Sequence, residues 1–121
     1  MIAPERGIIG GWKLRRGADD LVVCSEDVGE DEEHLDVRPG LGLVPFAVDV
    51  HASQWGTPTR LLHAVRAGLV REGWAIDEET LVEVSAGTIA VHGLGGAYRV
   101  RGSVDSLRVA IFLAGERRDV D

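Results

Sequence analysis

The stretch "LVPFAVDVHASQWGTPTRLLHAV", residues 43–65, joins a strand pattern to a helix pattern through a histidine. The residues before His51 are mostly apolar, which is typical of a buried strand. After it come polar and turn residues and then Thr57-Pro58, a favoured N-cap followed by a favoured first helical residue. A buried strand that leads into a helix predicts an α/β fold.

Apolar residues recur at helical spacing after Pro58, at Leu61, Leu62, Val65 and Leu69. This spacing predicts one apolar face on the helix, directed at a sheet. On the opposite face we expect three arginines turned towards solvent: Arg60, Arg66 and Arg71. One helix of about a dozen residues cannot cover both faces of a parallel sheet. We therefore expect the second layer to come from outside this chain or from a partner.

Strand patterns separated by glycine-rich turns fill the sequence after the helix. "GWAI" (73–76) reads as a short buried strand, and "LVEVSAG", "TIAVHGLGG", "AYRVRG" and "LRVAIFLAG" read as consecutive strands. Near the N-terminus, the apolar run 21–24 also fits a buried strand. The predicted fold is a single α/β domain over residues 1–121: a partial doubly wound (flavodoxin-like) sheet with a C-terminal antiparallel β-meander.

Composition narrows the functional classes. The chain has 121 residues, enough for one modest domain, and a formal net charge of −7. An acidic chain without a basic stripe is a poor binder of nucleic acid or of anionic membranes. No segment approaches the roughly 18 continuous apolar residues of a membrane helix. The single cysteine, Cys24, excludes an internal disulfide and is typical of the reducing cytoplasm.

His51 is the first candidate for chemistry, because sites in open α/β sheets collect beyond the carboxyl ends of strands. A histidine there can exchange a proton near neutral pH, although a loop histidine without a role is the alternative. Cys24 could pair with His51 as a thiolate dyad, or be a small buried residue. "EVSAGT" imitates a nucleophile elbow, but no helix follows it, so we expect Ser85 to lie in a hairpin. The histidine spacings predict no metal site, and we expect no cofactor.

A longer pattern carries a family resemblance. "RPGLGLVPFAVDVHASQWGTPTRLLHAVRAGLV" followed by "GWAIDEETLVEVSAGTIAVHGLGGAYRVR" resembles the C-terminal part of peptidase family S51, which includes dipeptidase E and cyanophycinase. The resemblance runs roughly from Arg38 to Arg101. It implies a class I glutamine amidotransferase-like fold and a Ser–His–acid triad, with His51 as the general base. For the acid, the resemblance and the acidic segment upstream favour Glu26 or Asp27, which would orient the imidazole.

The family's nucleophile lies in a Gly-x-Ser-Ala-Gly-Ala elbow, and no such motif precedes His51. We expect this chain to be the C-terminal half of a larger domain, inactive alone and acting on a peptide when completed. Met1 would follow the elbow, so we expect the in-frame codons upstream of it to encode Gly-x-Ser-Ala-Gly-Ala. A non-catalytic binding or interaction module and a hydrolase that uses Cys24 stay open as alternatives. Because half a sheet exposes an edge, we also expect self-association.

Overall fold

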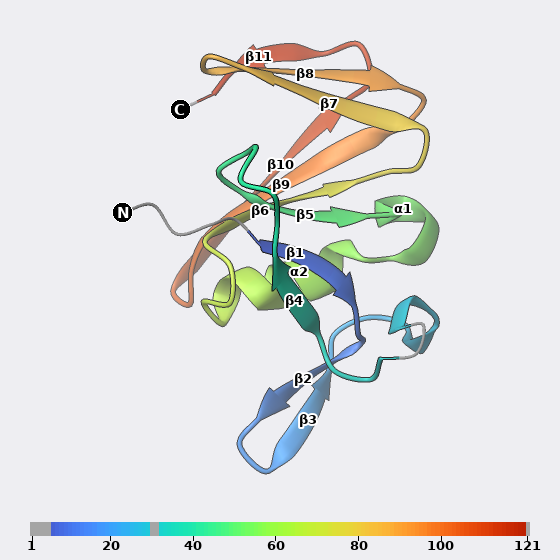
Figure 1. Ribbon diagram of the computed structural model, residues 1–121, viewed down its shortest axis with the longest axis vertical. Helices are drawn as coiled ribbons and strands as arrows, with labels where there is room; N and C mark the ends of the chain where they lie inside the picture. Colours follow the sequence, from blue (N-terminus) through green and yellow to red (C-terminus); the bar gives the residue numbers. More distant parts are fainter. Residues whose placement is uncertain (1–5, 30–31, 121) are drawn as a thin grey trace.

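A computed structural model describes residues 6–29 and 32–120 and places six strands in one mixed sheet (Figure 1). The strand order is β10-β9-β6-β5-β1-β4. These strands are β1 (Arg6–Gly10), β4 (Asp36–Pro39), β5 (Ala47–Val50), β6 (Glu72–Ile76), β9 (Gly96–Ser103) and β10 (Ser106–Leu113). β1, β5 and β6 run parallel to one another, whereas β4, β9 and β10 pair antiparallel with their neighbours. The fold is therefore mixed α/β, with little helix.

Two helices connect β5 to β6: α1 (Ala52–Trp55) and α2 (Pro58–Arg66). Pro58 occupies the first turn of α2, as its sequence context predicted. The apolar face of α2 packs on the sheet in a core that contains these buried residues: Ile8, Ala47, Ala52, Leu61, Ala64, Val65, Val70, Ala75 and Val100. The expectation that Arg60 points to solvent is wrong. Its side chain is only 5% exposed because it pairs with Asp49, which is buried in β5.

A second sheet lies at one end of the main sheet (Figure 1), where its buried side chains share a core with Trp74 and Phe112. It contains β7 (Thr80–Ser85), β8 (Thr88–Gly93) and β11 (Arg117–Asp119) in the order β11-β8-β7. Its buried side chains meet those of the main sheet in a second core: Phe46, Trp74, Ile89, Val91, Ala97 and Phe112. The chain thus supplies a second layer over this part of the sheet itself, contrary to the prediction from its single long helix.

The strands after residue 79 are antiparallel, but they do not form one continuous meander. β7 and β8 form a hairpin in which Ser85 pairs with Thr88, as predicted for Ser85. The chain then leaves this sheet through "GLGG" and enters the main sheet as β9. Gly93 has φ +114 and an added Cβ would collide with the backbone of Glu79, so this crossing requires glycine. The predicted meander is therefore divided between two sheets.

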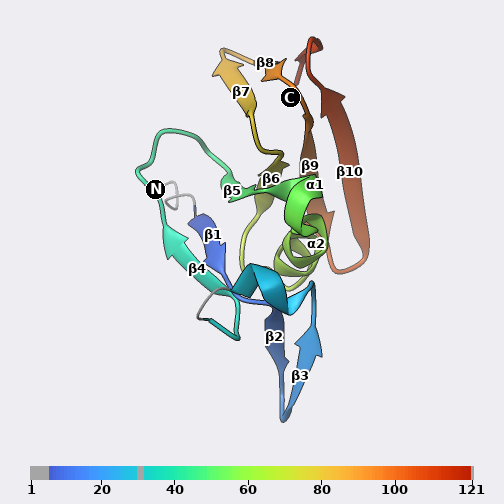
Figure 2. The same cartoon turned by 90° about the vertical axis from the view of Figure 1, so that its right-hand side faces the viewer.

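A hairpin of β2 (Lys13–Arg16) and β3 (Asp19–Val22) projects away from both sheets (Figures 1 and 2). Within the predicted buried strand 21–24, only Val23 is fully buried, because β3 pairs with β2 alone among the described strands. A short 3-10 helix, η1 (Glu26–Gly29), follows the hairpin and returns the chain to the main sheet.

Candidate functional site

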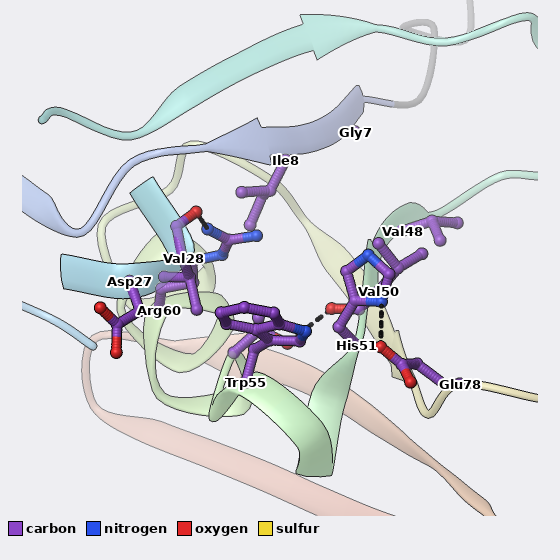
Figure 3. A pocket seen from close by; sticks show the side chains of 11 residues that line it. Gly7, Ile8, Asp27, Val28, Val48, Val50, His51, Trp55, Arg60 and Glu78 are labelled. Carbon is purple, nitrogen blue, oxygen red and sulfur yellow. Dashed lines mark hydrogen bonds and ion pairs between the residues drawn. The ribbon is translucent and has the colours of Figure 1, made fainter. Parts of the chain in front are cut away.

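A pocket of about 590 Å³ lies beside β1 and β5, next to the carboxyl end of β5 (Figure 3). In the described part of the chain, these two parallel strands pair at one position, Gly7 with Val48. The pocket is lined by Gly7, Ile8, Asp27, Val28, Val48, Val50, His51, Trp55, Thr57, Arg60 and Glu78. The carboxyl ends of parallel strands are where open α/β sheets place their ligands.

His51 follows β5 and is the N-cap residue of α1, where its backbone has an unusual conformation. Its φ of 56° and ψ of 40° are left-handed, a region that few residues other than glycine occupy. The carbonyl of His51 accepts the Trp55 N–H at 2.9 Å, so the same residue that ends the strand starts the first helical turn. Such a conformation costs an L-residue about 1–2 kcal/mol, and cases of this kind gather at functional sites.

The imidazole of His51 pairs with the carboxylate of Glu78, which follows the neighbouring strand β6. Nδ1 lies 3.1 Å from Oε1, and the two side chains are 51% and 46% exposed. Gln54 Oε1 accepts the Glu78 N–H at 2.9 Å, which ties this part of the chain to α1. The contact makes an ion pair when His51 is protonated, and it directs the Nδ1 side of the ring towards Glu78 and leaves Nε2 for another partner.

Two other histidines form carboxylate pairs, but through the other ring nitrogen. His34 Nε2 lies 3.0 Å from Asp20, and His92 Nε2 lies 2.8 Å from Glu83. Both pairs are outside the pocket. Among these three pairs of the described chain, His51 alone uses Nδ1 and keeps Nε2 free. That is the orientation that a triad histidine requires.

Asp77 holds together the elements that carry the pair. Its carboxylate accepts the N–H of Ser53 in α1 at 2.8 Å and the N–H of Gly96 in β9 at 2.8 Å. Burial raises the pKa of Asp77, but these hydrogen bonds outweigh it and the net shift is downwards. An ionised Asp77 therefore fixes the start of α1 against the end of β6 and the start of β9, and so fixes His51 relative to Glu78.

The wall of the pocket is braced by a buried ion pair. Arg60 Nε and Nη2 each lie 2.7 Å from a carboxylate oxygen of Asp49, and Nη1 donates to the carbonyls of Gly11 and Val28. Burial raises the pKa of Asp49, and the adjacent guanidinium opposes that shift. One side chain thus ties α2, β5, the end of β1 and η1 together.

The two carboxylates proposed from sequence lie elsewhere. Glu26 is exposed in η1 and does not line the pocket. Asp27 does line the pocket, but its carboxylate accepts a hydrogen bond from the Ser25 hydroxyl at 3.4 Å. Figure 3 shows Asp27 and His51 on opposite sides of Trp55. Among residues 6–29 and 32–120, the carboxylate paired with His51 is that of Glu78.

Sequence reasoning missed Glu78 because it sought the acid upstream of the histidine. A signal was present in "GWAIDEE". If that strand lies parallel and adjacent to the strand before His51, the residues that follow each strand meet at one edge of the sheet. The register confirms this neighbourhood, since Val50 pairs with Ile76.

The Cys24 side chain lies near the guanidinium of Arg60. Burial raises the pKa of its thiol, with the Arg60 charge opposing, and the S–H donates to the Gly11 carbonyl at 3.7 Å. A raised pKa keeps sulfur protonated, which does not suit a nucleophile. In the described chain, the thiol has no bond to His51.

Nearby hydroxyls are also engaged with other groups. The Thr57 hydroxyl donates to the Val50 carbonyl at 3.1 Å, and Ser53 Oγ lies 3.0 Å from the Tyr98 hydroxyl. No hydroxyl of the described residues is bonded to His51. Met1, which the family resemblance placed just after the nucleophile elbow, lies outside the described residues.

No group of three histidine, cysteine, aspartate or glutamate side chains in residues 6–29 and 32–120 is arranged to hold a metal ion. Within the same residues, none of the helices has the length and apolar character needed to cross a membrane. No family model, curated protein or solved structure matches the chain.

Proposed function

We propose that the chain carries the general base and the orienting acid of a serine-type hydrolase, with His51 as the base and Glu78 as the acid. The observation that carries the proposal is the Nδ1–Oε1 contact of 3.1 Å at the rim of the pocket. Nε2 would take the proton of a serine hydroxyl and return it to the leaving group, while Glu78 stabilises the imidazolium. Glu78 replaces Glu26 and Asp27 in this role.

The resemblance to peptidase family S51 supplies the rest of the proposal. The parallel strands β1, β5 and β6 and the crossover through α2 would be part of a doubly wound sheet, and the substrate would be a peptide. The nucleophile would be the serine of a Gly-x-Ser-Ala-Gly-Ala elbow placed near Nε2. Without that serine, the chain would not cleave peptides on its own.

A non-catalytic binding module is the second candidate. Two observations favour it: most of the pocket lining is apolar, and no described hydroxyl is bonded to His51. Such a module would use the same pocket without proton transfer, so the two candidates differ in what His51 does.

Hydrolysis of p-nitrophenyl acetate distinguishes the hydrolase from the binding module. A positioned base or an imidazole nucleophile is enough to hydrolyse this activated ester. We expect the chain to accelerate hydrolysis above buffer, His51→Ala to abolish that excess, and Glu78→Gln to reduce it. His92→Ala and Glu83→Gln are matched controls, since His92 and Glu83 form a similarly exposed pair outside the pocket. Equal losses in both sets, or no acceleration by the wild type, would favour the binding module.

A further inference from the structure

The hairpin of β2 and β3 forms an arm that no other layer of the described chain covers. It projects away from both sheets (Figures 1 and 2), and among the described strands β2 and β3 pair only with each other. An isolated bridge between Lys13 and His34 ties down its base. A two-stranded hairpin is only marginally stable in water unless another element packs against it. The arm therefore has a face on which a partner would stabilise it.

The two strands of the arm carry opposite charges. The charged side chains of β2 are all positive, Lys13, Arg15 and Arg16, and those of β3 are both negative, Asp19 and Asp20. The register places Arg16 opposite Asp19 beside the turn, and both residues are exposed. Within residues 6–29 and 32–120, neither of these two side chains forms an ion pair. The tip of the arm therefore offers one cation and one anion to a partner.

One face of the arm is apolar next to its charged tip. Side chains alternate along a strand, so Leu14 lies on the same face of β2 as Arg16, and Leu21 lies on the same face of β3 as Asp19. Leu14 pairs with Leu21, so all four side chains share one face. Both leucines are half-buried and belong to neither of the two cores. A partner for this face needs apolar side chains and one charge of each sign, in the same arrangement.

We propose that a second copy of this chain packs against this face, with a two-fold axis along the arm. Rotation about that axis lays β2 of each copy over β3 of the other, so Leu14 meets Leu21 of the partner subunit and Arg16 meets Asp19 of the partner subunit. Edge-to-edge pairing would instead set β2 against β2 or β3 against β3, which brings like charges together. Few residues take part, so the contact is weak and transient. The arm is separate from the pocket, and the proposal does not rest on the proposed hydrolase function.

Two charge-reversal variants test the contact between copies independently of the stability of the hairpin. Arg16→Glu makes the tip of the arm acidic and Asp19→Arg makes it basic, so neither variant should associate through the arm when it is alone. A mixture of the two should associate, because the acidic tip of one variant then faces the basic tip of the other. A folding defect within one hairpin would not be corrected by mixing. Every variant also carries Val109→Lys, which opposes pairing through the edge strand β10.

The ¹⁵N-labelled Arg16→Glu chain is titrated with unlabelled Asp19→Arg or with unlabelled Arg16→Glu, while the amides of Leu14 and Leu21 are followed. We expect the oppositely charged partner to bind on the order of ten-fold more tightly, since two exposed ion pairs replace two repulsive contacts. Added salt should narrow the difference.

Arg71→Glu and Glu79→Arg make the same charge changes at exposed positions outside the arm. Each of these control variants should still associate through the arm when it is alone, and mixing them should bring no gain. No shift at the arm in the mixture of Arg16→Glu and Asp19→Arg, equal affinity for the two unlabelled partners, or loss of association in either control would each overturn the proposal.

Discussion

His51 Nδ1 meets Glu78 Oε1 at 3.1 Å because two parallel strands end side by side. β5 places the histidine and β6 the glutamate, while Asp77, the residue before Glu78, clamps α1 against β9. The pair thus depends on the backbone at the carboxyl end of the sheet. Substitutions at these positions test that dependence.

Replacing His51 should reveal the strain of its left-handed backbone. His51→Gly should be about 0.5–1 kcal/mol more stable than His51→Ala, since glycine adopts positive φ without a Cβ penalty. Urea unfolding of both variants measures the difference. At His63 in α2 the order should reverse, because glycine is about 1 kcal/mol worse than alanine inside a helix. The same order at both sites would contradict the left-handed assignment.

Asp77→Asn should lower the free energy of unfolding at neutral pH by about 1.5–3 kcal/mol, since hydrogen bonds to a charged acceptor are lost or weakened. It should also impair ester hydrolysis, because Asp77 fixes His51 relative to Glu78. Gln54→Ala, which removes only the bond to the Glu78 N–H, should have a smaller effect on unfolding.

The Asp77 effect should depend on pH with a defined sign. Its folded pKa is lowered, so its contribution to stability is full above the unfolded pKa of about 3.9 and disappears as pH falls through the folded pKa. The stability difference between the wild type and Asp77→Asn should therefore begin to shrink as pH falls below about 3.9 and should be smallest below the folded pKa of Asp77. A constant difference from pH 7 to pH 2.5 would contradict the role of the ionised carboxylate.

Breaking the buried pair should be costly. Arg60→Met leaves Asp49 buried without its cation and should destabilise the chain by about 3–5 kcal/mol. Asp49→Leu combined with Arg60→Met should recover much of that loss, since an apolar pair needs no desolvation of charge. Arg38→Ala, which breaks an exposed bidentate pair with Asp36, is the control and should barely change the melting temperature. Similar losses at both arginines would contradict the burial of Arg60.

Self-association stays a prediction, and the structure indicates where it would occur. β10 is an edge strand of the main sheet (Figure 2). Val109, Ile111 and Leu113 are half-exposed along it. Arg118 donates to the Ile111 carbonyl and Glu116 accepts the Leu113 N–H, so part of this edge is blocked. We expect concentration-dependent association in sedimentation velocity.

Val109→Lys should weaken that association, because a charge on an edge strand opposes pairing with another copy. Leu94→Lys, in the exposed turn between β8 and β9, should not change it. A wild-type chain that stays monomeric across the concentration range would contradict the prediction.

The spacing of apolar residues predicted the elements around His51, because β5, α2 and β6 each show the strand or helix period within their own residues. They did not predict Arg60 as buried, since helical spacing alone assigns a charged residue to solvent. The missed signal was Asp49 inside the apolar run "FAVDV": a buried carboxylate requires a partner, and an arginine on the next helix can provide it.

Glu78 could not be derived from spacing, because its proximity to His51 depends on β5 pairing with β6. The division of the C-terminal strands between two sheets has a similar origin. Each strand has the expected alternation, but whether β9 pairs with β8 or with β6 is decided by which apolar faces it covers. The rings of Trp74 and Phe112, whose centroids lie 5.0 Å apart, come from two strands of the main sheet and share a core with the buried side chains of β8.

The tautomer of His51, read from two-bond ¹⁵N–¹H correlations of the neutral ring, directly tests whether this histidine is held as a general base. We expect His51 to carry its proton on Nδ1, donated to Glu78, and we expect Glu78→Gln to alter the signals of this ring and leave those of His92 unchanged. His92 should carry its proton on Nε2, facing Glu83. A His51 ring protonated on Nε2, with signals insensitive to Glu78→Gln, would contradict its assignment as the general base.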